Sequence, residues 1–108
     1  MGFSILILTL NEEANLPACI ESVSWCDDIV VLDSFSADGT AAVAEASGAR
    51  VVRRRFDDFA AQRNHALDEV AFRHRWVFHL DADERFTPEL LAECQRAIGE
   101  DIHSGYLV

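Results

Sequence analysis

The chain has 108 residues, half of them hydrophobic, which is typical of a single folded domain and argues against an intrinsically disordered protein. Nine basic and nineteen acidic residues give a formal charge of −10, so much of the surface repels nucleic acid and anionic lipid. We therefore expect no nucleic-acid partner. The charge does not exclude an anionic small ligand, because a bound cation can reverse the field locally.

The cysteines and the N-terminal segment bear on where the protein works. Cys19, Cys26 and Cys94 are odd in number and lack the spacing of a zinc motif, which favours reduced thiols in a cytoplasmic protein. The apolar run at the start has no basic segment before it, and Asn11-Glu12-Glu13 follows it in place of a cleavage site. This run therefore predicts a strand and no signal peptide.

Four predicted strands alternate with four predicted helices. The strands are Phe3 to Leu8, Asp28 to Leu32, Arg50 to Arg53 and Trp76 to Leu80. The first two are continuous apolar runs, which indicates that both faces of a parallel sheet are covered. The first helix follows Asn15 as its N-cap, and the second runs from Gly39 to Ser47 and stops at Gly48. The third runs from Phe59 to Phe72, and the fourth begins with Thr87 as N-cap and Pro88 at its first position.

This alternation predicts an α/β fold with right-handed crossovers, namely a Rossmann-like parallel sheet in the order 3-2-1-4 with flanking helices. Residues 1–108 show no linker or internal repeat, so we treat them as one domain or subdomain. The last five residues resemble the start of another strand. We therefore expect the chain to be part of a longer protein.

The most informative motif is Asp81-Ala82-Asp83, directly after the fourth strand. Two carboxylates in this pattern can reach one hard cation and one hydroxylated ligand, and Mg²⁺ or Mn²⁺ favours such oxygen ligands when it carries a substrate's phosphates. Taken alone, an Asp-x-Asp is more often a turn or helix cap.

Two more polar loops follow the first and second strands. They contain Thr9, Asn11, Glu12 and Glu13, and then Asp33, Ser34, Ser36 and Asp38. The carboxyl ends of parallel strands share one edge of the sheet, and ligands bind there at a switch point. Each loop alone is explained by helix capping, but the coincidence of all three favours a binding site.

Arg63 adds to this interpretation. It is four residues from both Phe59 and Leu67, so it lies on the apolar face of the third helix. A charged residue facing inward needs a partner, and a ligand phosphate, the edge of a uracil-like ring or Asp33 could serve. Alternatively, its side chain extends past the sheet edge into solvent.

Four ordered segments together resemble glycosyltransferase family 2, whose members have the GT-A nucleotide-binding fold. They are Thr9-Leu10-Asn11-Glu12-Glu13, the run from Val30 to Thr40, Gln62-Arg63-Asn64-His65-Ala66, and Leu80-Asp81-Ala82-Asp83-Glu84. The residues from Cys26 to Asp33 and from Phe59 to Leu67 are most similar to the lipopolysaccharide-core glucosyltransferase-like branch, which acts in cell-envelope polysaccharide biosynthesis. Phe35 and Ala37 depart from the small residue and the threonine usual in that family's second loop.

The resemblance implies a role for each matching position. Thr9, Asn11 and Glu13 would line the nucleobase and ribose end, Asp33 would accept a hydrogen bond from uracil, and Arg63 would flank the base or the diphosphate. Asp81 would contact the ribose or the sugar. Asp83 would bind the divalent metal, Mn²⁺ or Mg²⁺, that holds the diphosphate.

The resemblance also implies the reaction. The chain would be the donor-binding part of an inverting glycosyltransferase. The donor would be a nucleoside-diphosphate sugar with UDP as the nucleotide, and the acceptor would be a glycan or a lipid-linked molecule. The catalytic base would lie beyond residue 108, so we expect the isolated chain to be inactive. The complete enzyme would be cytoplasmic or at the inner face of the membrane, and exposed sheet or helix surfaces of an incomplete domain could support a homodimer.

Three alternatives stay open at this point. A phosphatase of the aspartyl-phosphate type also uses an Asp-x-Asp, although only 25 residues follow the pair here. A receiver-like domain would place Asp33 near a phosphorylation pocket, but the sequence contains no lysine. A non-catalytic module that keeps the sheet is the third.

Overall fold

The computed structural model describes residues 3–55, 58, 61, 64–66, 70–74 and 76–100. Within them, four strands form one parallel sheet in the order β3-β2-β1-β4, as predicted. The strands are β1 (Phe3–Thr9), β2 (Ile29–Asp33), β3 (Arg50–Arg53) and β4 (Trp76–Asp81). Three of them end one residue later than predicted, because Thr9, Asp33 and Asp81 still pair in register with a neighbouring strand.

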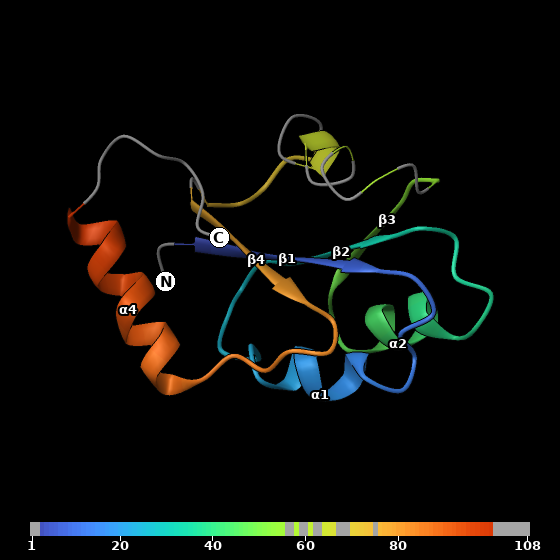
Figure 1. Cartoon of the computed structure of the whole chain (residues 1–108), viewed down its shortest axis with the longest axis horizontal. Coiled ribbons are helices and arrows are strands. Elements are labelled where there is room, and N and C mark those ends of the chain that lie inside the picture. The colour runs from blue at the N-terminus through green and yellow to red at the C-terminus, as the bar shows by residue number, and fades with distance from the viewer. Residues whose placement is uncertain are drawn as a thin grey trace.

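The helices cover both faces of this sheet (Figure 1). The named ones are α1 (Leu16–Glu21), α2 (Thr40–Ala46) and α4 (Pro88–Glu100). Helices α1 and α2 lie below the sheet in this view, whereas a short helical segment at residues 64–66 lies above it. The expectation of helices on both sides is therefore confirmed.

Alternating residues of β1 supply the two halves of the core. Ile5 and Ile7 pack on the α1 and α2 side with Leu16, whereas Leu6 packs on the opposite side with Ala66. All five side chains are completely buried. A strand covered in this way has no polar face, which explains why β1 is a continuous apolar run.

The helix ends agree only in part with the sequence-based prediction. The Thr87 hydroxyl accepts a hydrogen bond from the Leu90 N–H over 3.1 Å, so Thr87 is the predicted N-cap of α4. Gly48 ends α2 with a φ of 88°, which suits glycine. Asn15 is the predicted N-cap residue of α1, but its side chain makes no capping hydrogen bond, and its amide group donates to Glu12 instead.

The third helix is shorter than predicted. Residues 61 and 64–66 are helical, but residues 70–72 are not, so the helix does not extend to Phe72. Ala66 is its buried contact with the sheet. Phe59, Arg63 and Leu67 lie outside the described residues, so the inward position of Arg63 stays a prediction.

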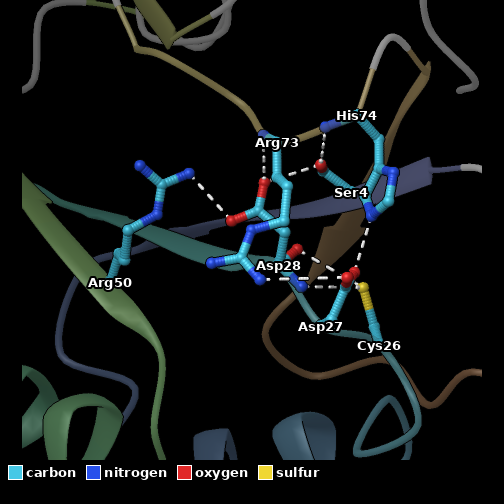
Figure 2. Close-up of polar contacts among 7 residues, drawn as sticks. All are labelled: Ser4, Cys26, Asp27, Asp28, Arg50, Arg73 and His74. Carbon is cyan, nitrogen blue, oxygen red and sulfur yellow. Dashed lines mark hydrogen bonds and ion pairs between the residues drawn. The ribbon is translucent and has the colours of Figure 1, made fainter.

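A polar cluster centred on a buried aspartate connects the amino-terminal ends of the strands (Figure 2). Its centre is Asp28, which accepts hydrogen bonds from the Ser4 hydroxyl (2.6 Å), the Arg73 N–H (2.7 Å) and Nη2 of Arg50 (2.8 Å). Next to it, Nε2 of His74 lies 2.6 Å from Oδ1 of Asp27. The cluster ties β1, β2, β3 and the segment before β4 together at the edge remote from the predicted site.

The structure also bears on the cysteines and on membrane-spanning helices. No disulfide joins any two of the three cysteines, and all three side chains are buried. Among the described residues, no helix has both the length and the apolar character needed to cross a bilayer.

Candidate functional site

The ends of three strands bring the predicted polar residues to one edge of the sheet. Thr9 pairs with Asp33 in the register of β1 and β2, and Leu8 pairs with Asp81 in the register of β1 and β4. Strand β1 therefore lies between the two acidic strand ends, with the loops that follow all three strands on the same side (Figure 1). This confirms the predicted placement of Thr9, Asp33 and Asp81.

Asp33 is the polar centre of the first part of this edge. Its Oδ1 accepts hydrogen bonds from the hydroxyls of Thr9 (2.7 Å) and Ser36 (2.5 Å), and its Oδ2 accepts one from the Ser36 N–H (2.9 Å). The residue is 1% exposed. In this structure the carboxylate joins the ends of β1 and β2 to the loop that follows β2, and its role as an acceptor for uracil stays a prediction.

Asn11 and Glu13 extend the link between the first loop (residues 10–15) and the second loop (residues 34–39). Oδ1 of Asn11 accepts a hydrogen bond from the Ala37 N–H, and Oε1 of Glu13 accepts one from the Gly39 N–H. In the other direction, the N–H groups of both residues donate to side chains of the second loop, Ser36 and Asp38. The two loops thus form one rigid unit, in which one acceptor of each side chain is already used.

Two large apolar side chains project from this unit into solvent. Leu10 is 50% exposed and Phe35 is 62% exposed. Each lies between residues that join the loops, because the Ser34 N–H donates to the Thr9 carbonyl and the Asn11 N–H donates to Ser36. Phe35 also has a φ of 58°, a conformation that is costly for a bulky residue and that occurs preferentially at functional sites.

The third loop (residues 82–87) is anchored from below by α1 and the core. The Phe86 N–H donates to the Ser22 hydroxyl over 2.9 Å, and the Cys19 thiol donates to the Asp81 carbonyl over 3.5 Å. The Phe86 ring lies 5.1 Å from that of Phe78, edge to face, and Ala82 is buried beside it. The backbone that carries Asp81 and Asp83 is therefore held in place.

The carboxylates of Asp81 and Asp83 face outward from this anchored backbone. The Asp81 side chain is 64% exposed, with Oδ1 3.5 Å from Nε2 of His79. Asp83 is exposed, and its carboxylate makes no hydrogen bond or ion pair with another described residue. Both side chains are accessible to a ligand.

A divalent cation fits this donor set in one particular way. Within the part of the chain that the structure describes, no three His, Cys, Asp or Glu side chains converge on one point. Mg²⁺ and Mn²⁺ commonly bind through one or two carboxylates together with substrate phosphates and water. An exposed carboxylate such as Asp83 suits that mode, and no closed cage of protein ligands is needed.

The negative charge at this edge of the sheet also favours a bound cation when the ligand is a diphosphate. The three loops and the adjoining strand ends carry seven acidic residues, namely Glu12, Glu13, Asp33, Asp38, Asp81, Asp83 and Glu84, and Arg85 is their only basic residue. Such an edge repels a diphosphate, because like charges raise the energy of the bound state. A cation between the carboxylates and the phosphates removes this repulsion.

For three contributors to this edge, the sequence did not predict the contact that the structure shows. Ser36 donates twice to Asp33, Thr40 accepts a hydrogen bond from the Glu12 N–H, and Glu84 closes the third loop. Ser36 and Glu84 lie three positions after an acidic strand end, the spacing at which side chains bond to a turn backbone. That spacing was the available signal.

Comparison with known proteins identifies the family of this chain. The family model described as "Glycosyl transferase family 2" matches residues 4–108. A curated relative, the lipopolysaccharide core biosynthesis glycosyltransferase LpsC of Rhizobium meliloti (strain 1021), is 39% identical over 111 residues. That alignment covers 92% of this chain but 40% of LpsC, so the chain spans about two fifths of the length of this relative.

Two solved structures have a similar fold. One is glucosyl-3-phosphoglycerate synthase of Mycobacterium tuberculosis in complex with Mn²⁺, UDP and glucosyl-3-phosphoglycerate, with 28% identity and a TM-score of 0.66 over 78% of this chain and 35% of that chain. The other is mannosyl-3-phosphoglycerate synthase of Rubrobacter xylanophilus, with a TM-score of 0.77 over 94% of this chain and 37% of that chain. The second is 24% identical and supports the fold alone.

The parallel sheet in the order 3-2-1-4 thus matches the nucleotide-binding half of the GT-A fold, as expected. The phosphatase-like and receiver-like alternatives have no support in these matches. By its ordered motifs, its sheet topology and the family model that covers residues 4–108, the chain belongs to glycosyltransferase family 2.

Proposed function

We propose that this chain forms the donor-binding part of a glycosyltransferase that moves a sugar from a UDP-linked donor to a glycan or lipid-linked acceptor. The observation that carries this proposal is the anchored Asp81-Ala82-Asp83 turn at the same edge as the Thr9–Asp33 link. Membership of family 2 supports it, as does a relative whose structure contains Mn²⁺ and UDP.

In this proposal Asp83 binds a divalent cation, Mn²⁺ or Mg²⁺, together with the diphosphate of the donor. When bound, the cation stabilises the negative charge that develops on the departing nucleoside diphosphate. Asp83 suits this role because its carboxylate is exposed and uncommitted among the described residues. Asp81, on the same anchored turn, accepts hydrogen bonds from hydroxyls of the ribose or the sugar.

The nucleoside would occupy the first and second loops. Leu10 and Phe35 offer exposed apolar surface on which a base can stack, a contact that tolerates any flat ring. The bond between Thr9 and Asp33, together with those of Asn11 and Glu13 to the second loop, holds the loop backbone beside the base in this proposal. Arg63 flanks the base or the diphosphate in this proposal, and its position lies outside the described residues.

In this proposal none of the described residues acts as the catalytic base. Burial raises the pKa of the Cys19 thiol to about 11, so this thiol stays protonated near neutral pH and is no nucleophile. A carboxylate beyond residue 108 would deprotonate the acceptor hydroxyl and give inversion by direct displacement. We place the complete enzyme in the cytoplasm or at the inner face of the membrane, with a homodimer as one form.

Titration calorimetry of the complete protein with UDP, with and without Mn²⁺, tests the proposal. We expect UDP to bind more tightly with Mn²⁺, and Asp83→Asn to abolish that difference, because a carboxylate and phosphate oxygens together complete the metal shell. Asp81→Asn should weaken UDP binding in both conditions, with a smaller effect on the metal dependence.

Asp27→Asn is a matched control, because this carboxylate is exposed at the opposite edge of the sheet. It should leave both affinities unchanged. UDP binding that is independent of metal and insensitive to Asp83→Asn would contradict the proposal and return the Asp81–Asp83 pair to the role of a turn cap. Failure of the wild type to bind any nucleoside diphosphate would favour the non-catalytic alternative.

A further inference from the structure

The turn that carries Asp81 and Asp83 is closed by two hydrogen bonds between the same two residues. The Glu84 N–H donates to the Asp81 carbonyl over 2.9 Å, and the Asp81 N–H donates to Oε1 of Glu84, also over 2.9 Å. The first bond is the ordinary closure of a four-residue turn. The second engages an acidic side chain that the proposed reaction does not otherwise use.

The geometry separates Glu84 from its two acidic neighbours. Oε1 of Glu84 points back to the turn backbone, whereas the carboxylate of Asp83 makes no hydrogen bond or ion pair with another described residue. A carboxylate that accepts a backbone N–H forms a charge-assisted hydrogen bond, which is stronger than a neutral one. Glu84 therefore fixes the backbone on which Asp81 and Asp83 are mounted.

The surroundings supply rigidity on the other side of the turn. The Asp81 carbonyl also accepts a hydrogen bond from the Cys19 thiol. The Phe86 N–H donates to the Ser22 hydroxyl, and the Phe86 ring packs against that of Phe78. The Asp81 N–H, however, has Glu84 as its acceptor in this structure. Without that side chain the N–H would bond to water, and of the two bonds between Asp81 and Glu84 only the backbone one would close the turn.

We propose that Glu84 is a positioning residue for the Asp81–Asp83 pair, which holds the turn ready for the cation and the nucleotide without binding either. This inference rests on the proposed function, since it assigns Asp81 and Asp83 to the ligand. Holding ligand groups in place before binding lowers the entropy lost on association. In this proposal Glu84 acts through an acceptor oxygen on the turn backbone and not through a contact with the cation.

Two substitutions distinguish the acceptor from the charge. Glu84→Gln keeps an oxygen at the acceptor position, whereas Glu84→Ala removes it. We expect Glu84→Ala to weaken Mn²⁺-dependent UDP binding about fivefold, the net value of one hydrogen bond, and Glu84→Gln to stay within about twofold of wild type. Glu45→Ala, the same change at an exposed site on α2, should have no effect.

A second readout needs neither metal nor nucleotide. Exchange of the Asp81 amide proton, followed by NMR in the ligand-free protein, should be faster in Glu84→Ala and close to wild type in Glu84→Gln. This measurement tests the positioning role even when the wild type binds no UDP, in which case the proposed function fails by itself.

Two results would overturn the inference. Equal loss of metal-dependent binding in Glu84→Gln and Glu84→Ala would show that the charge matters and that Glu84 binds the cation directly. Unchanged amide exchange and unchanged UDP affinity in Glu84→Ala would show that the bond to Asp81 positions nothing.

Discussion

The hydroxyl of Thr9 donates a hydrogen bond over 2.7 Å to Oδ1 of Asp33, a residue 24 positions further along the chain. The two residues are register partners at the last pair of β1 and β2. The same oxygen also accepts the Ser36 hydroxyl, so one buried carboxylate joins two strand ends and one loop. Much of the candidate site depends on this single side chain.

We predict that Thr9→Val and Ser36→Ala destabilise the protein non-additively. Either change alone leaves Oδ1 of Asp33 with one hydroxyl donor and should cost about 1 kcal/mol. The double variant leaves that oxygen without a hydroxyl donor, so it should lose roughly 0.5–3 kcal/mol more than the sum of the single changes. Urea unfolding of the wild type and the three variants measures this coupling.

Ser47→Ala provides the control for this cycle. The Ser47 hydroxyl donates to the Val43 carbonyl at the exposed end of α2, away from Asp33. Combined with Thr9→Val, it should be additive. Additive behaviour of Thr9→Val with Ser36→Ala as well would argue against a shared acceptor.

Phe35→Asn should separate stability from ligand binding. Phe35 has a φ of 58°, a conformation that asparagine tolerates far better than a bulky residue. We therefore expect unchanged or increased stability. UDP affinity should fall by at least about fivefold, since base stacking on an aromatic ring is worth roughly 1–3 kcal/mol.

Phe35→Tyr keeps the ring and should retain the wild-type affinity in the same calorimetric titration. Normal UDP affinity of Phe35→Asn would show that the exposed ring has no role in binding the nucleoside. Thermal unfolding of both variants checks the stability part of this prediction.

Asp28→Asn should destabilise the protein in a pH-dependent way. Burial raises the pKa of Asp28, but hydrogen bonds from Ser4, the Arg73 N–H and Arg50 outweigh it and hold the pKa below its ordinary value of 3.8. Folding therefore favours the ionised carboxylate. Its contribution is fully present above pH 3.8 and is lost as the pH falls through the lower folded-state pKa.

We expect a loss of about 1–3 kcal/mol near neutral pH for Asp28→Asn, because buried donors lose a charged acceptor. The difference from wild type should narrow as the pH falls below 3.8, in unfolding curves measured at several pH values. Asp27→Asn, at an exposed neighbour, should cost less. A difference for Asp28→Asn that is constant with pH would rule out the ionised form as the source of stability.

Cys19 should be unreactive in the folded protein. Burial raises the pKa of its thiol to about 11, so almost no thiolate is present near neutral pH. Iodoacetamide should alkylate Cys19 only after unfolding, as read by mass spectrometry. Glutathione of known reactivity calibrates the reagent, and rapid alkylation of Cys19 in the native state would contradict its buried position.

The sequence allowed the sheet to be predicted almost completely. Continuous apolar runs predicted β1 and β2, and the alternation of strands with helices predicted the order β3-β2-β1-β4. Thr87 and Gly48 also behaved as their local chemistry indicates. These features depend on residues close in sequence, so their patterns are visible without a structure.

Asn15 shows where local reasoning is only partly right. It occupies the predicted N-cap position of α1, yet its amide group donates to Glu12 and caps no N–H of the helix. The Glu12 carbonyl instead accepts the Leu16 N–H at the start of the helix. Three successive residues of the first loop donate to side chains of the second loop and of Thr40, the first residue of α2, and these longer-range bonds fix the backbone just before Asn15.

By itself, the sequence determined the fold class, the edge at which the polar residues gather, and the family that the motifs resemble. Only the tertiary structure decided what each side chain does there. Asp33 is a buried link, Glu84 closes a turn, and Asp83 keeps its carboxylate exposed. The reason is physical: apolar periodicity is local, whereas a carboxylate's role depends on which donors reach it from distant parts of the chain.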